Sequence, residues 1–195
     1  MGDGLTADTL RLPLQTRRLI LRPPVAADLV AIARLINDPV IAQSTGLIRH
    51  PYPVISGWRW LAAVEASAGS SFHMPYLLTL RSNPRLIAGA VGISVKQHGI
   101  PTIGYWVAKA YRRRGFASEA ARAMVTLAFS RSDVAAVGAS ARISNIPSQR
   151  VLLGTGMRRV GRGRIKSAQL GRYVPTFIYR IDRKAWEKAC KPVAQ

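Results

Sequence analysis

The sequence predicts a single α/β domain, in which helices cover a mixed, mostly antiparallel sheet. Three observations support this fold class. The length of 195 residues suits one domain, three strand-like segments follow one another in the middle of the chain, and segments with helical spacing of apolar residues lie before and after them. The domain is expected to cover residues 15–188, after a flexible tail at residues 1–14.

The N-terminal third is expected to contain a strand and two helices. Arg17–Arg22 is typical of a short strand, which two prolines then stop. Apolar residues within Leu29–Ile36 follow helical spacing. Pro39 ends this helix, because the residue before a proline is pushed out of the helical region. A second helix is expected over Ser56–Ala66.

The middle of the chain predicts an antiparallel meander. Tyr76–Arg81, Leu86–Lys96 and Thr102–Val107 are each typical of a strand. The segments 82–85 and 97–99 between them contain turn residues and are short enough for hairpins.

The last third is expected to alternate helices and strands. A long helix is predicted over Ser118–Arg131 and a short one over Pro147–Leu153. An apolar strand is expected between them at Val134–Ala141, and a final pair of strands at Met157–Val160 and Tyr173–Ile181.

Composition excludes several kinds of protein. No apolar run approaches the ~18 residues of a membrane span, and Met1–Leu10 lacks the basic and apolar regions of a secretory signal. Cys190 is the only cysteine, so neither an internal disulfide nor a cysteine-based metal cluster is expected. We therefore expect a cytoplasmic protein without a metal.

The net charge of +20 makes this a strongly basic protein. Polyphosphate cofactors, nucleic acid, ribosomes and acidic proteins are all attracted to such a field. Solubility and a coding bias towards arginine explain the same excess equally well, so charge alone does not assign a function.

The chemistry is concentrated where the third meander strand leads into the long helix. Helix-initial N–H groups lack partners within the helix and carry the positive end of its dipole, so anions bind there. Gly115 lets the backbone approach an anion closely and adopt a positive φ. Ser118 is expected to cap the helix and Glu119 to favour its positive end. The run Arg112–Arg114 adds positive charge at the same place.

Arg112–Ala117 matches the Arg/Gln-x-x-Gly-x-Gly/Ala signature of the GNAT (Gcn5-related) acetyltransferases, and the chain resembles this family. The resemblance extends over about residues 15–187. The segments RRLILRP near the start, IGYWV before the signature and Asn145–Leu152 after it are similar to the RimJ/RimL-like branch, which acetylates the N-termini of ribosomal proteins.

The resemblance implies a GNAT fold that binds acetyl-CoA and moves the acetyl group directly to an amine. Backbone groups of Trp106, Val107 and Lys109 would pair with the pantetheine arm, and an N–H near Val107 would polarise the thioester carbonyl. Asn145 is the residue implied to be catalytic, although capping of the following helix explains it as well. Arg150 is a weaker candidate for cofactor contact. The implied cofactor-binding residues are Trp106, Val107, Arg112, Arg113, Arg114, Gly115, Phe116, Ala117, Ser118, Asn145 and Ser148.

The acid and base of the family are not where the resemblance places them. Leu152 or Leu153 stands where many members have a tyrosine acid. Thr102 and Ile103 stand where the related branch often has a glutamate, and Pro175 where it often has an aspartate. The substitutes in this sequence are His73, His98, Glu65 and Glu119 as bases, and Tyr105, Tyr173 and Tyr179 as acids, each of which also has a structural explanation.

Two alternatives remain beside an N-acetyltransferase. One is a GNAT-like protein that binds acyl-CoA without catalysis, and the other is a basic nucleic-acid-binding module. The acceptor is expected to be a protein N-terminus, with a ribosomal protein as one option, or a small amine. The expected recognition loops, residues 38–58, 67–75 and 161–174, contain no distinctive constellation. A homodimer is also expected from relatives.

Overall fold

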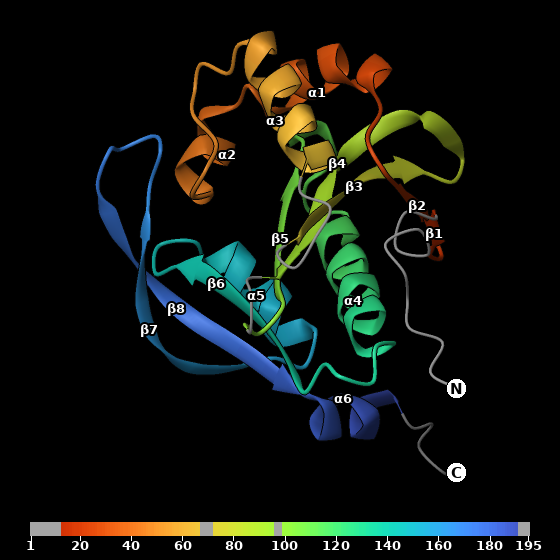
Figure 1. Ribbon diagram of the computed structural model, residues 1–195, viewed down its shortest axis with the longest axis vertical. Helices are drawn as coiled ribbons and strands as arrows, with labels where there is room; N and C mark the ends of the chain where they lie inside the picture. The colour runs from red at the N-terminus through yellow and green to blue at the C-terminus, as the bar shows by residue number, and fades with distance from the viewer. Residues whose placement is uncertain (1–12, 67–71, 96–98, 191–195) are drawn as a thin grey trace.

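The computed structural model describes residues 13–66, 72–95 and 99–190. These residues form an eight-stranded sheet in the order β1-β2-β3-β4-β5-β6-β8-β7, with helices on both faces (Figure 1). Neighbouring strands are antiparallel except β5 and β6, which are parallel. The predicted α/β fold with a mostly antiparallel sheet is therefore confirmed. Most of the expected tail, residues 1–12, lies outside the described residues.

Most predicted elements are present with shifted ends. The strands are β1 (Leu14–Gln15), β2 (Leu19–Arg22), β3 (Phe72–Leu80), β4 (Asn83–Val95), β5 (Thr102–Val107), β6 (Ala136–Arg142), β7 (Arg158–Lys166) and β8 (Tyr173–Asp182). The α-helices are α1 (Leu29–Ile36), α2 (Pro39–Ser44), α3 (Val54–Ala66), α4 (Phe116–Phe129), α5 (Ile146–Gly154) and α6 (Arg183–Cys190).

The sheet carries a separate apolar cluster on each face. Successive side chains of a strand point to opposite faces, so Leu77 of β3 packs with Leu29 of α1 and Leu61 of α3, whereas Tyr76 faces the main core with Met124 of α4. Helices α1 and α3 thus cover one face, and α4 covers the other (Figure 1). Among the described residues, none of the helices has the length and apolarity that crossing a membrane requires.

Helix α2 was not predicted, although its signal is visible in the sequence. Pro39 does end α1, as expected, but it also starts α2, because proline at the first helical position has the right φ and needs no N–H partner. Asp38 caps α2, and its Oδ1 accepts a hydrogen bond of 2.8 Å from the Val40 N–H.

The prediction of a recognition loop at residues 161–174 is wrong. Strand β7 continues to Lys166 and pairs with β8 along its length, so only residues 167–172 connect the two strands. Gly161 and Gly163 weakened the strand signal in the sequence. Gly163 instead makes room for a neighbour, since a Cβ at this position would lie 3.1 Å from Ile178 Cδ1. Helix α6 was also missed; Asp182 Oδ1 accepts a 2.8 Å hydrogen bond from the Ala185 N–H in its first turn.

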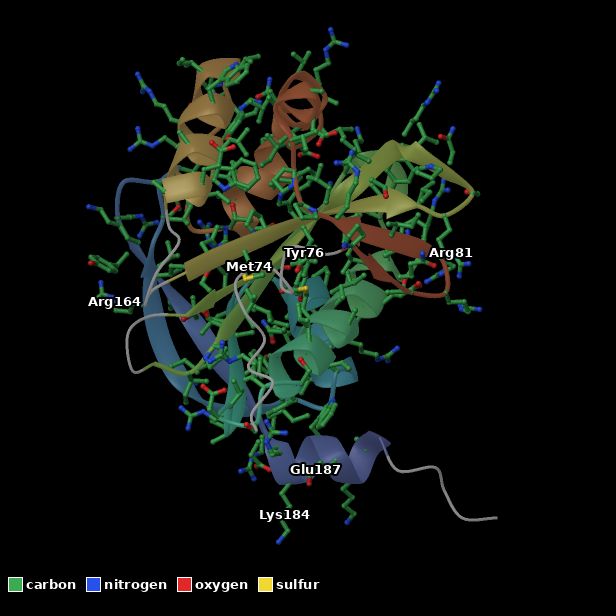
Figure 2. All side chains as sticks on the ribbon, turned by 45° about the vertical axis from the view of Figure 1, so that its right-hand side comes forward. Met74, Tyr76, Arg81, Arg164, Lys184 and Glu187 are labelled. Carbon is green, nitrogen blue, oxygen red and sulfur yellow. The ribbon has the colours of Figure 1, made fainter. Side chains whose placement is uncertain are left out.

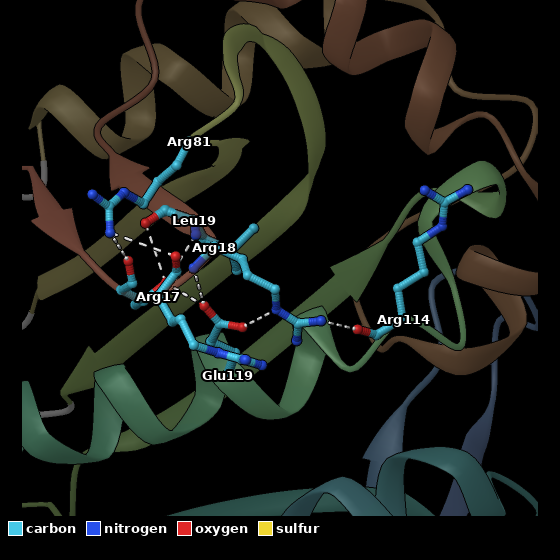
Figure 3. Close-up of polar contacts among 7 residues, drawn as sticks. Arg17, Arg18, Leu19, Arg81, Arg114 and Glu119 are labelled. Atoms are coloured by element: carbon cyan, nitrogen blue, oxygen red, sulfur yellow. Dashed lines mark hydrogen bonds and ion pairs between the residues drawn. The ribbon is translucent and has the colours of Figure 1, made fainter.

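Helix α4 begins two residues earlier than expected, and Gly115 rather than Ser118 is its N-cap. Glu119 fixes this end of the helix to the start of the sheet (Figure 3). Its carboxylate accepts hydrogen bonds from Thr16 Oγ1 at 2.6 Å, from the Arg18 N–H at 2.7 Å and from Arg18 Nε at 2.7 Å. Arg18 Nη1 also donates to the Arg114 carbonyl oxygen at 2.8 Å, so one side chain joins β2, α4 and the turn before it.

We expect Glu119→Gln to lower the free energy of unfolding by about 2 kcal/mol, because charge-assisted hydrogen bonds contribute ~1.5–3 kcal/mol each. Burial raises the pKa of the Glu119 carboxyl, but the bonds from Thr16 and Arg18 outweigh it and leave the pKa lowered. The carboxylate therefore stabilises the fold above its unfolded pKa, and this contribution is lost as the pH falls through the lower folded value. Urea unfolding at pH 7 and pH 3 measures both effects, with the exposed Glu65→Gln as control. Equal stabilities at pH 7 would contradict this role.

Candidate active site

A cleft of about 1770 Å³ lies between β5, the turn before α4, helices α1–α3 and the β7–β8 hairpin. The cleft has two halves, which differ in the residues that line them. The half where the cofactor is expected, called the cofactor half, is lined by the end of β5, by residues 111–113 and 115–118 and by the start of α5. The half where the acceptor is expected, called the acceptor half, is lined by most residues of 44–49 and 51–56, by β3 and by the hairpin.

Strands β5 and β6 part next to the cofactor half. Their parallel pairing is confined to Thr102 and Gly138, so the strands are not hydrogen-bonded beyond this point. On its other side β5 pairs with β4 along its whole length, and the Ala108 N–H donates to the Ala88 carbonyl oxygen at 2.9 Å. Because backbone direction alternates along an antiparallel strand, the groups of Trp106 face β4. Those of Tyr105 and Val107 face the opening.

The turn that follows β5 has the backbone of an anion-binding loop. Gly115 has φ 77° and lies in the left-handed region, which glycine adopts without steric cost. Arg113 also has a positive φ of 62°, while Arg114 between them does not. Alternating φ signs turn successive N–H groups towards one concavity, as in anion-binding nests. The free N–H groups of α4 begin immediately after it.

The arginines of this turn have different surroundings. Arg112 Nε donates to the Val107 carbonyl oxygen at 3.1 Å, and its Nη2 lies 2.6 Å from Asp38 Oδ2, so this side chain ties α2 to the turn. Burial raises the pKa of the Asp38 carboxyl, but its hydrogen bonds from Val40 and Arg112 outweigh this effect and leave the pKa lowered. Arg113 and Arg114 have no acidic partner among the described residues, and the Arg114 guanidinium lies 5.7 Å from the Tyr111 ring centre. Arg113 and Arg114 are therefore the cations available to an anion.

Helix α5 begins beneath the opening between β5 and β6. Asn145 is its N-cap, and its Oδ1 accepts a hydrogen bond of 3.2 Å from the Ser148 N–H. Capping therefore occupies the oxygen of the residue that the resemblance implies to be catalytic. Ser148 Oγ lies 2.9 Å from the Tyr105 hydroxyl, and burial raises the pKa of this tyrosine to about 12. Tyr105 stays protonated at neutral pH and presents a hydroxyl pair with Ser148 at the opening.

His73 lies on the acceptor side of the sheet, over a trough formed by glycines. A Cβ at Gly92 would lie 3.2 Å from His73 Cε1, so the imidazole occupies the space that a side chain would fill. Gly104, the partner of Gly92 on β5, has nothing within 4 Å of such a Cβ. His73 Nδ1 lies 2.7 Å from Ser94 Oγ, and Nε2 has no hydrogen bond to the described residues. Burial lowers the pKa of His73, so it is neutral at pH 7.

The other candidate bases and acids are not in the cleft or are otherwise engaged. Glu65 and Glu119 do not line it, and Glu119 is held by Arg18. Tyr173 is 56% exposed and does not line the cleft. Tyr179 lines the cleft, but its hydroxyl donates to Gln149 Oε1 at 3.3 Å. His98 lies outside the described residues.

Most of the implied cofactor-binding residues come together in the cleft. Those that line it are Trp106, Val107, Arg112, Arg113, Gly115, Phe116, Ala117, Ser118, Asn145 and Ser148. Lys109, Arg114 and Arg150 do not line it. Trp60 borders the acceptor half, while Trp58 is 50% exposed elsewhere on α3. In the part of the chain that the structure describes, no group of three or more potential metal ligands occurs.

The sequence did not reveal the trough or the Asp38–Arg112 ion pair. Both depend on residues far apart in the chain, which only strand register and helix packing bring together. Gly92 and Gly104 were visible as strand glycines, but nothing in the sequence shows that they are neighbours.

A family model described as "Acetyltransferase (GNAT) domain" matches residues 18–158, which is more than half of the chain. No curated protein matches the chain significantly. The expected family and the expected acetyl-CoA-dependent N-acetyltransferase class agree with this match.

Solved structures with the same fold include relatives with different acceptors. RimJ of Mycobacterium smegmatis in complex with CoA-disulfide has a TM-score of 0.73 and 22% identity, over 89% of this chain and 87% of that chain. RimL, a ribosomal L7/L12 α-N-protein acetyltransferase in complex with coenzyme A, has a TM-score of 0.75 and 18% identity, over 89% and 99%. AAC(6')-Ib in complex with ribostamycin and coenzyme A has a TM-score of 0.73 and 19% identity, over 89% and 98%.

Proposed function

The chain belongs to the GNAT acetyltransferase family, and we propose that its cleft moves the acetyl group of acetyl-CoA directly to the amine of a protein N-terminus or of a small molecule. The observation that carries this proposal is the opening between β5 and β6, which leads into the Gly115 turn within one cleft. An extended pantetheine arm needs backbone partners, and a pyrophosphate needs N–H groups and cations. The opening and the turn supply them side by side.

The cofactor half supplies binding and polarisation. The N–H groups of the turn and of α4, with Arg113 and Arg114, would hold the phosphates. The Val107 N–H faces the opening and would donate to the thioester oxygen as negative charge develops there, a contribution of ~3–4 kcal/mol in other enzymes. The Tyr105 hydroxyl donates to Ser148 and would leave the Ser148 hydroxyl proton free to donate to the sulfur as it leaves. This serine would serve where many family members use a tyrosine at the position of Leu152 or Leu153.

We propose His73 as the group that takes the proton from the incoming ammonium. The described residues that line the cleft include no carboxylate. The imidazole lies one strand from the open space over Gly104, where the amine would approach the thioester. In the tautomer whose Nδ1–H donates to Ser94, Nε2 carries the lone pair. The neutral amine then attacks the carbonyl carbon, the C–S bond breaks, and an amide and free CoA result.

Release of CoA is the measurement that tests acetyl transfer. With acetyl-CoA and a panel of short peptides with free α-amines, we expect CoA thiol release that depends on the peptide and an added acetyl group on its α-amine by mass spectrometry. Saturable acetyl-CoA binding with no peptide-dependent release, on peptides and small amines alike, would support the alternative of an acyl-CoA-binding protein without catalysis. The expected cytoplasmic location and homodimer stay predictions.

We expect His73→Ala to lower kcat by about 10²-fold, because a positioned general base contributes ~10²–10⁴-fold, while leaving acetyl-CoA affinity unchanged. In the wild type, kcat/KM should fall as the pH drops through the lowered His73 pKa. In the variant, this decrease should be absent, and only the pH dependence caused by protonation of the substrate amine should remain. Added imidazole should restore part of the rate. His50→Ala, which changes a histidine outside the cleft, serves as control. A wild-type pH profile in the His73→Ala variant would refute the assignment.

A further inference from the structure

We infer that the acceptor half binds an amine on an anionic carrier, best matched by the N-terminus of an acidic peptide, and disfavours polycationic amines. This inference rests on the proposed function, because it names the acceptor class of the same site. It follows from the sign of the charges that surround the acceptor half and from the absence of carboxylates in its lining.

Cations lie on two sides of the cleft. Arg49 lies in the loop before α3, and Arg164 and Arg180 lie on the β7–β8 hairpin; all line the cleft (Figure 2 labels Arg164 on the hairpin). None has a carboxylate partner among the described residues, and the Arg164 guanidinium instead lies 5.6 Å from the Tyr173 ring centre. Among the described residues, no Asp or Glu lines the cleft. The charged side chains of this lining are therefore all positive.

A buried arginine strengthens this field from behind. Arg142 at the end of β6 is 8% exposed, and its Nη2 donates to Ser167 Oγ at 2.6 Å and to the Thr45 carbonyl oxygen at 3.0 Å. These bonds hold the residue 44–46 segment against the hairpin. Both acceptors are neutral, and Arg142 Nε has no partner at all among the described residues. An arginine remains protonated in proteins, so the acceptor half stands beside a buried positive charge that no protein anion compensates.

The acidic residues of the chain do not offset these charges. Asp38, which lies beside the turn, is paired with Arg112. Glu65 of α3 has no ion pair among the described residues and does not line the cleft. Further described carboxylates form ion pairs away from the cleft, as in Arg18–Glu119, Arg22–Asp28, Arg131–Asp133 and Arg158–Asp182. Acetyl-CoA brings phosphates to the opposite half, where Arg113, Arg114 and the helix end already match them. At physiological salt, exposed charges further apart than ~8–10 Å are largely screened from each other.

The acceptor chemistry follows from complementarity. An acidic peptide places carboxylates beside Arg49, Arg164 and Arg180 while its α-amine reaches the trough at His73. A polycationic amine, of which an aminoglycoside is an example, would meet the same arginines without a counter-charge, and like-charge juxtaposition opposes binding.

Peptide binding tests the inference. We would use CoA-saturated protein and measure the Kd of three labelled peptides of equal length with a free N-terminal alanine followed by acidic, neutral or basic residues. At ~0.05 M salt we expect the acidic peptide to bind at least about tenfold more tightly than the basic one, and the difference to narrow at ~0.5 M salt. Equal affinities, or tighter binding of the basic peptide, would overturn the inference.

A matched control distinguishes binding at the acceptor half from nonspecific attraction of anions by the net charge of +20. Arg49→Glu and Arg164→Glu should each weaken acidic-peptide binding several-fold, and together they should abolish the preference. Arg85→Glu changes the charge equally at an exposed position in the β3–β4 hairpin, away from the cleft, and should have little effect. Equal weakening by all three variants would mean nonspecific attraction and would overturn the inference.

Turnover of the same peptides distinguishes a failure of the inferred acceptor class from a failure of the proposed function. Binding judges the acceptor class, whereas CoA release judges acetyl transfer. Charge-selective binding without release would count against the proposed function alone, and release that is equal for acidic and basic peptides would count against the acceptor class alone.

Discussion

The single pairing between β5 and β6, at Thr102 and Gly138, is the constraint on which the cleft depends. Two parallel strands that stayed paired would satisfy each other's backbone groups and leave no room between them. Because they part, the backbone of Tyr105 and Val107 faces an opening, and the start of α5 lies beneath it with Ser148 against Tyr105. The same opening joins the Gly115 turn at one end and the glycine trough at the other. In the proposed reaction, cofactor and acceptor approach each other at this opening.

Polar contacts around the opening anchor helix ends and turns that are not hydrogen-bonded into the sheet. Glu119 and Arg18 fasten the start of α4 and the turn before it to β2. Arg112 fastens the turn to α2 through Asp38, and Arg142 fastens the loop after α2 to the hairpin. These arginines act through neutral or acidic partners inside the fold, so only part of the strong positive charge faces the cleft. This division explains why the charge of the whole chain is a poor guide to its function.

Local patterns predicted the fold and the conformation of the Gly115 turn, because these depend on neighbouring residues. Helical spacing located α1, α3, α4 and α5, and the strand–turn–helix order located the Gly115 turn with its positive φ. Features that depend on distant pairing were not predictable. Ser118 looked like a helix cap, whereas Gly115 is the N-cap of α4. Residues 161–174 looked like a loop because of their glycines, although β7 pairs with β8 and Gly163 packs against Ile178. His73 was one of several candidate bases in the sequence, and only strand register showed that it lies over Gly92, next to the open space at Gly104.

Calorimetric binding of acetyl-CoA at ~0.3 M salt, where nonspecific attraction is screened, tests most directly whether the Gly115 turn and the β5–β6 opening form a cofactor site. CoA and ADP should be compared, together with a Gly115→Glu variant. That variant forces a side chain into the left-handed conformation and places a negative charge where the phosphates would lie. We expect one saturable site for acetyl-CoA, much weaker binding of ADP, and loss of binding in the variant. Acetyl-CoA that binds no better than ADP, or that binds the variant as tightly as the wild type, would contradict the account.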